Sequence, residues 1–363
     1  MTAISRGSLL RGIAGGSLLA LASGCTDDAS GPTQRPAPPS GSGDPSPSGT
    51  PAETPSVEVT SVPGFAAQTH HGSDMRIGAI RERGAGWTTY DVSYSAHSEG
   101  PGAYTDPLTI SGVLTIPDGD GPFPVAVLAH GYIDPAKYVT GQGMTRERKW
   151  LGERGWATLH TDYRGHAASD EDPTHGADVR LGYAVDVIAA LDALRTSDDS
   201  QLAGLDVDRA AVFGRSMGGG IAQKVLQIAP DAFGVGVMWA AVSSLEAENV
   251  DWFVGLTDAR TKAFTSRLAT PEEDPEFWEG VSTRPFFDRI TAPVLIVHGR
   301  TDDVCPPAWA EETYDAMRRA GVDVELEWYG EGHSFDADFA PAMERSFAFS
   351  RKAMPRIRQA SGL

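Results

Sequence analysis

The chain contains few of the groups that build a disulfide framework, a metal cluster or a basic surface. Its 363 residues include only two cysteines, Cys25 and Cys305, too few for a disulfide scaffold or a cysteine zinc site. No H-E-x-x-H, paired C-x-x-C or P-loop sequence occurs, so the sequence predicts neither a metal nor a nucleotide cofactor. With 30 lysine and arginine residues against 49 acidic ones, the net charge of −19 disfavours nucleic acid as a partner.

Acidic side chains are missing from the first 24 residues, which have the pattern of a secretory signal. Two arginines precede a short apolar run, Ile13–Ala22, that is too short to span a bilayer. The sequence L-A-S-G-C that ends at Cys25 resembles the bacterial lipobox. We therefore predict a lipoprotein signal over residues 1–24, a lipid on Cys25 and an extracytoplasmic, membrane-anchored protein. Ordinary signal cleavage and secretion is the alternative, because Ala22 stands where the lipobox usually has leucine.

Bulky apolar residues are missing from the segment that follows. From Thr26 to Ser56 there is no Val, Ile, Leu, Met or aromatic residue, and proline, glycine, serine and threonine predominate. Such a segment cannot bury enough apolar surface to offset its conformational entropy, so residues 25–56 are predicted to form a disordered tether. The folded domain is predicted over residues 57–363. His70 and His71, near the tether, are expected to be solvated.

Strand and helix patterns alternate along the folded part. Two segments with alternating apolar residues come first, and continuous apolar runs typical of strands buried on both faces follow. This order predicts an α/β fold with a mostly parallel sheet covered by helices on both faces. The predicted strands are 87–96, 108–117, 123–129, 157–162, 209–213, 234–241, 293–297 and 322–329, and the predicted helices are 147–154, 179–194, a segment ending at 229, 307–320 and 341–358.

An insert of about fifty residues separates two of these strands, over about 243–290, and is longer than a simple crossover needs. One interpretation is a small helical insert with its own core, and the other is a lid whose aromatic residues line a substrate pocket. The aromatic residues are Trp252, Phe253, Phe264, Phe277, Trp278, Phe286 and Phe287.

Ser216 lies at the centre of the sequence G-R-S-M-G, which fits G-x-S-x-G. The motif follows the strand 209–213 and opens a helix. A turn this sharp needs glycine on both sides and strains the central residue, whose hydroxyl is then exposed at the edge of the sheet. Ser216 is therefore the candidate nucleophile.

A serine nucleophile needs a base, and the base needs an acid that orients it. His333, in a glycine-flanked loop after the last predicted strand, is the candidate base. Asp302, after another strand end, is the candidate acid, and Asp303 is the alternative. The backbone N–H groups of Met217 and Tyr132 are the candidate oxyanion donors.

These motifs and their order resemble those of the α/β-hydrolase superfamily. The resemblance rests on L-A-H-G-Y at 128–132, D-Y-R-G-H at 162–166, G-R-S-M-G-G at 214–219, H-G-x-x-D-D at 298–303 and G-H-S-F at 332–335. Within the superfamily, the chain is most similar to the dienelactone-hydrolase-like group and to the catalytic domain of the prolyl oligopeptidase family.

The resemblance implies an α/β-hydrolase fold and a serine hydrolase with the triad Ser216, Asp302 and His333. It also implies mostly structural roles for Asp162 and Arg164, and Cys305 stands where the family usually has an aliphatic residue. His130 is expected to pack the turn after the strand 123–129, and a role as second base is the alternative. The expected substrate is a carboxylic ester, and a short peptide is the alternative. Only about thirty residues separate the tether from the first predicted strand, too few for the propeller of prolyl oligopeptidases. A non-catalytic surface binding module is the second alternative.

Overall fold

A nine-stranded sheet organises the residues that the structure, a computed structural model, describes: 59–173, 178–253 and 268–354. They belong to one compact unit, Glu53–Leu363. The predicted signal, Cys25 and the tether lie outside the described residues. Among the residues described, no helix combines the length and apolar character needed to cross a bilayer.

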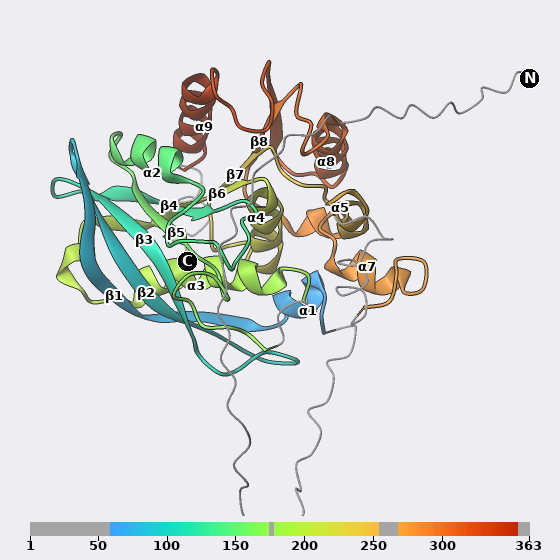
Figure 1. Cartoon of the computed structure of the whole chain (residues 1–363), viewed down its shortest axis with the longest axis horizontal. Coiled ribbons are helices and arrows are strands. Elements are labelled where there is room, and N and C mark those ends of the chain that lie inside the picture. Colours follow the sequence, from blue (N-terminus) through green and yellow to red (C-terminus); the bar gives the residue numbers. More distant parts are fainter. Residues whose placement is uncertain (1–58, 174–177, 254–267, 355–363) are drawn as a thin grey trace, which may run out of the picture. The chain divides into compact units, whose positions relative to one another are not determined.

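The strand order in the sheet is β1-β2-β3-β5-β4-β6-β7-β8-β9. At one side of the sheet, β1, β2, β3 and β5 form three antiparallel pairs. The rest of the sheet, in the order β5-β4-β6-β7-β8-β9, is parallel (Figure 1). This is the α/β-hydrolase fold that the sequence predicts. The strands are β1 Thr69–Gly84, β2 Trp87–Glu99, β3 Leu108–Pro117, β4 Phe123–Ala129, β5 Ala157–Thr161, β6 Leu205–Arg215, β7 Val235–Trp239, β8 Val294–Gly299 and β9 Val324–Tyr329.

Helices cover both faces of the sheet and bury a separate apolar cluster on each. Helices α3, α4 and α8 pack on one face and α2 and α9 on the other (Figure 1). Strand β4 contributes to both clusters, since Val125 and Val127 belong to one and Ala126 and Leu128 to the other. The helices are α1 Val62–Ala66, α2 Thr145–Gly152, α3 Leu181–Thr196, α4 Met217–Ile228, α5 Glu246–Phe253, α7 Pro275–Val281, α8 Pro307–Arg319 and α9 Phe339–Ala353, with 3₁₀ turns η1 Ser200–Leu202 and η2 Arg284–Arg289.

Strand β1 is the main element that the sequence pattern does not predict. Its burial does not alternate regularly, because it is an edge strand with register shifts and a residue, Asp74, at a φ of 51°. The expectation that His70 is solvated is wrong. Its ring nitrogens lie 2.7 Å from Ser98 Oγ and 2.9 Å from Phe65 O, and burial lowers its pKa to about 4.

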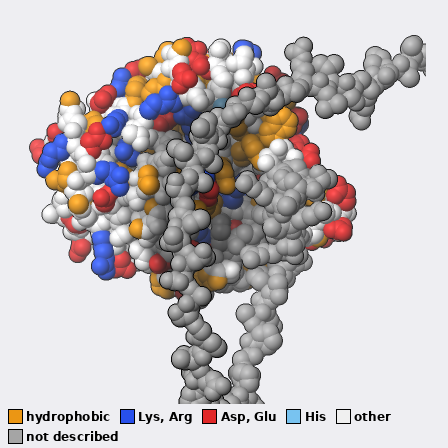
Figure 2. Space-filling view, viewed as in Figure 1, with side chains coloured by type: hydrophobic (Ala, Val, Ile, Leu, Met, Phe, Trp, Pro, Cys, Tyr) orange, Lys and Arg blue, Asp and Glu red, His pale blue; other side chains and the backbone are white. Residues whose placement is uncertain are grey.

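The insert is helical where it is described, with α5, α7 and η2. Phe277, Trp278 and Phe287 are buried in the same apolar cluster as residues of α3 and α4, so in the described residues the insert packs onto the main core and the expectation of a core of its own is wrong. Trp252 and Phe253 are exposed and lie against Trp309 of α8. Phe264 lies outside the described residues. Figure 2 shows side chains of both charge signs spread over the visible face of the described part.

Candidate active site

Ser216 joins β6 to α4 in a strained turn. Its backbone adopts φ 57° and ψ −123°, a conformation that costs a non-glycine residue about 1–3 kcal/mol. The Ser216 amide donates to Trp239 O on β7 at 2.9 Å, which holds the turn against the sheet. A Cβ at Gly214 would lie 2.1 Å from Gly218 O, and one at Gly218 would lie 1.9 Å from Ala129 O. Both glycines are therefore required, as the sequence predicts.

The loop after β4 lies against the candidate nucleophile. A Cβ on Gly131 would come within 3.1 Å of Ser216 Cβ and 3.7 Å of its Oγ, so the backbone of this loop approaches the serine closely. Tyr132, the next residue, is 66% exposed. The amide of Met217 is the first of helix α4, and amides at this position have no acceptor within their own helix. Both candidate oxyanion donors thus belong to segments that border Ser216.

The ring of His130, at the start of this loop, is buried among aromatic side chains. Its ring stacks between Tyr138 and Tyr163, with centroids 4.6 and 4.2 Å away, and the Tyr163 hydroxyl donates to His130 O at 3.2 Å. Burial lowers the pKa of His130 to about 3, so the ring is neutral. Asp162, which accepts from Tyr138 at 2.8 Å, is buried in the same layer.

The candidate base and acid meet, although 31 positions separate them in the sequence. His333 Nδ1 lies 2.9 Å from Asp302 Oδ2, and the Asp302 side chain is fully buried. The other carboxylate oxygen accepts from the amides of Val304 and Cys305 at 2.9 and 2.8 Å. Since Nδ1 of His333 is used for Asp302, Nε2 is the ring nitrogen left to accept a proton. Asp303, the alternative acid, is exposed.

Electrostatics keep Asp302 ionised. Burial by itself would raise the pKa of this carboxyl, but the hydrogen bonds from His333 and from the two amides outweigh burial and hold the pKa below its ordinary value. A charged carboxylate fixes the tautomer of His333 and stabilises the imidazolium that forms when the ring takes a proton.

The thiol of Cys305 lies beside the Ser216 hydroxyl, a contact that the sequence does not predict. Burial raises the pKa of the Cys305 thiol to about 12, so the group is neutral. Its backbone amide binds Asp302, as described above, and its carbonyl lies 3.0 Å from His298 Nε2. Cys305 therefore connects the acid to the surroundings of Ser216, while its burial agrees with the expected small apolar role.

Two arginines hold the loop that carries His333, and sequence reasoning missed both. Arg215, the residue before Ser216, donates to His333 O at 3.0 Å and to Ser334 O at 2.6 Å. Arg146 donates to Ser334 O at 2.7 Å and to Phe335 O at 3.2 Å. The nucleophile turn is thus tied directly to the backbone of the base.

Replacing Arg215 with methionine is expected to lower kcat about 10- to 100-fold, because a displacement of about 1 Å at a catalytic group has an effect of this order. The variant also leaves Glu147, a buried partner of Arg215 at 3.1 Å, without its counter-charge, so Tm should fall. Adding Glu147→Gln removes that unpaired charge and should restore Tm but not kcat. Steady-state kinetics and thermal melts of the two variants separate the effects, and an unchanged kcat in both would show that Arg215 does not position the loop.

Comparison with known proteins identifies the family. A model of the prolyl oligopeptidase family matches residues 143–354, more than half of the chain. Dipeptidyl aminopeptidase BIII of Pseudoxanthomonas mexicana is 28% identical over 253 residues, which cover 64% of this chain and 34% of that protein. Dipeptidyl peptidase family member 6 of Caenorhabditis elegans is 25% identical over 233 residues, which cover 60% of this chain and 30% of that protein. The chain thus spans about a third of the length of these relatives.

Solved structures share the fold at lower identity. An acetyl xylan esterase from Paenibacillus sp. R4 superposes with a TM-score of 0.58 at 19% identity, over 80% of this chain and 92% of that chain. An acylaminoacyl peptidase from Pyrococcus horikoshii superposes with a TM-score of 0.53 at 15% identity, over 77% of this chain and 56% of that chain. With the match over residues 143–354, the chain belongs to the prolyl oligopeptidase family.

Proposed function

We propose that this chain is a serine hydrolase that cleaves carboxylic esters through an acyl-enzyme on Ser216. The observation that carries the proposal is the 2.9 Å hydrogen bond between His333 and Asp302, whose loops are joined to the strained Ser216 turn through Arg215 and Cys305. In this proposal, three segments far apart in the sequence supply the nucleophile, the base and the acid that acyl transfer requires.

In the proposed cycle, the Ser216 hydroxyl attacks the substrate carbonyl while His333 takes its proton. The amides of Met217 and Tyr132 stabilise the negative charge that develops on the carbonyl oxygen. His333 then gives the proton to the leaving alcohol, and the acyl group remains on Ser216. Water, activated by the same histidine, releases the acid and restores the serine.

Coverage of the structural relatives favours an ester over a peptide. Acetyl xylan esterases are matched over 88% and 92% of their chains, so the described domain corresponds to nearly all of such an enzyme. Acylaminoacyl peptidase chains are matched over 49–56%. We therefore propose a carboxylic ester as the substrate. The dipeptidyl peptidase relatives support a peptidase as the second candidate.

The experiment compares p-nitrophenyl esters with peptide anilides, with a fluorophosphonate as the active-site probe. We expect ester turnover and labelling by the probe, both lost in Ser216→Ala. Hydrolysis of the anilides without turnover of any ester would replace the esterase proposal by the peptidase. Folded protein that neither labels nor turns over any substrate would indicate the binding module.

We further propose that the enzyme is held at a membrane, outside the cytoplasm, by a lipid on Cys25. Support comes from the signal pattern over residues 1–24 and from Cys25, followed by the tether over 25–56. Expression of Cys25→Ser in a bacterial host should move the protein from the membrane fraction to the soluble fraction. An unchanged distribution would contradict the anchor and favour secretion.

A further inference from the structure

The outer strand pair of the sheet brings together three side chains that are typical metal ligands. His71 of β1 pairs directly with His97 of β2, and Glu99 follows two residues later on the same strand. Because successive side chains of a strand alternate between faces, His97 and Glu99 share a face. Gly72, beside His71, packs against Ala189 of α3, so His71 points to the face opposite that helix.

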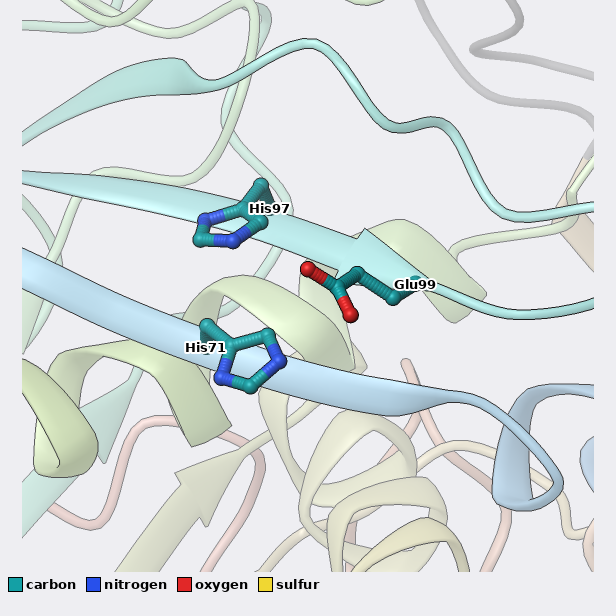
Figure 3. A group of neighbouring side chains, drawn as sticks. All are labelled: His71, His97 and Glu99. Carbon is teal, nitrogen blue, oxygen red and sulfur yellow. The ribbon is translucent and has the colours of Figure 1, made fainter.

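The potential ligand atoms of the three side chains lie within 4.8 Å of one another. Figure 3 shows the two imidazole rings on neighbouring strands with the Glu99 carboxylate beside both. The ring centroids of His71 and His97 are 4.9 Å apart with an angle of 23° between the planes. Tetrahedral zinc holds its nitrogen and oxygen ligands about 3.4 Å apart, so the ligand atoms must approach by up to about 1.4 Å, and the two rings must rotate out of their stacked arrangement because each nitrogen lone pair lies in its ring plane.

The geometry leaves these side chains able to make that movement. In the described part of the chain, neither His71 nor His97 is held by a hydrogen bond, and Nδ1 of His97 is buried without a partner. Rotation of an imidazole about χ2 meets a broad torsional minimum, and Glu99 is exposed and can change rotamer. By contrast, neighbouring His70 is fixed through both ring nitrogens.

We propose that His71, His97 and Glu99 bind one divalent transition-metal ion, with zinc as the best fit. Two imidazoles and one carboxylate suit zinc, whereas magnesium and calcium prefer sites built from oxygen ligands. Three protein ligands leave a fourth position for water at the exposed side of the cluster. The ion links β1, the edge strand, to β2 and so stabilises the folded state.

The metal site is separate from the candidate active site, and it does not depend on the proposed function. Strands β2 and β6 are separated by three other strands, which corresponds to about 19 Å at the usual spacing. An ion between β1 and β2 is therefore too far from Ser216 to contact a substrate carbonyl there. Bound zinc should raise the stability of the protein. The metal-free enzyme should still hydrolyse its substrate.

The test is a zinc titration by calorimetry on the full chain without a polyhistidine tag, after treatment with a chelator. One equivalent of zinc should bind, and Tm should rise with zinc concentration. His71→Ala should lower the affinity at least about 100-fold, since even loss of groups that only support ligands costs 10- to 100-fold. His97→Phe keeps an aromatic ring at the cross-strand position without a ligand nitrogen, so it should lose zinc and remain folded.

Two matched controls separate the cluster from adventitious binding. Glu279→Gln removes an exposed carboxylate on α7, and His333→Ala removes a histidine elsewhere, so both should retain one equivalent of zinc. Glu99→Gln should weaken binding. The proposal is overturned if the wild-type chain binds no zinc, or if His71→Ala and His97→Phe bind it as well as the wild type.

Discussion

Replacing Ser216 with alanine is expected to lower kcat for ester hydrolysis by about 10⁵- to 10⁶-fold, the size of effect seen when a triad serine is removed. Attack on the carbonyl requires the hydroxyl, and the buried thiol of Cys305 beside it cannot substitute because its pKa of about 12 keeps it protonated. The fold should be unaffected, since alanine fits wherever serine does. Initial rates with a p-nitrophenyl ester measure kcat, and a thermal melt measures whether the fold is unaffected.

A double variant makes this prediction sharper. Triad residues act as a unit, so Ser216→Ala combined with His333→Ala should be no slower than either single variant. Ser334→Ala is a matched control, because it removes an exposed serine next to the base while the backbone carbonyl that binds Arg215 and Arg146 remains. Multiplicative losses in the double variant would show that Ser216 and His333 do not share one proton transfer.

Replacing Asp302 with asparagine is expected to lower kcat about 10⁴-fold, the size of effect seen when a triad carboxylate is neutralised. The amide keeps the shape of the side chain but can present its N–H₂ group to His333 Nδ1, which then favours the wrong tautomer for a base. Asp303→Asn is the matched control, one residue along the same loop and exposed, and its kcat should stay at the wild-type value. If Asp303→Asn lost activity and Asp302→Asn kept it, the acid would be Asp303.

The same pair of variants tests the electrostatics of Asp302. A carboxyl with a lowered pKa in the folded state stabilises the protein above its unfolded-state pKa, near 3.9, and loses that contribution as pH falls through the folded-state value. Asp302→Asn should therefore be less stable than the wild type at neutral pH. The difference in the free energy of unfolding should shrink below about pH 4. Denaturant melts across this range measure it, and a difference that grows in acid would contradict the lowered pKa.

Local patterns were sufficient for the parallel half of the sheet. The apolar run 123–129 predicts β4 with the bounds that the structure has, and the strand predicted at 209–213 lies within β6, Leu205–Arg215. The buried stretches of these strands, Val125–Ala129 and Ala210–Gly214, contain no charged residue and are therefore easily recognised. The helices over 181–196 and 307–319 likewise lie within two residues of their predicted ends.

Prediction fails where burial depends on distant partners. Half of the residues of strand β1 are exposed and the strand has register shifts, so its sequence lacks a regular alternation. What makes it a strand is pairing with β2. The contacts of Arg215 with the carbonyls of His333 and Ser334 join residues 118 and 119 positions apart, and nothing near Arg215 in the sequence indicates them.

The motifs of the chain, by their resemblance to those of the α/β-hydrolase superfamily, already indicated the fold and the candidate residues Ser216, Asp302 and His333, because glycine-bounded turns after buried strands are local features. Only folding brings His333 to Asp302, ties the loop of His333 to Arg215, and places His71 opposite His97 on the neighbouring strand. The physical reason is that strand register and loop packing depend on the whole core, whose apolar contacts connect residues throughout the chain.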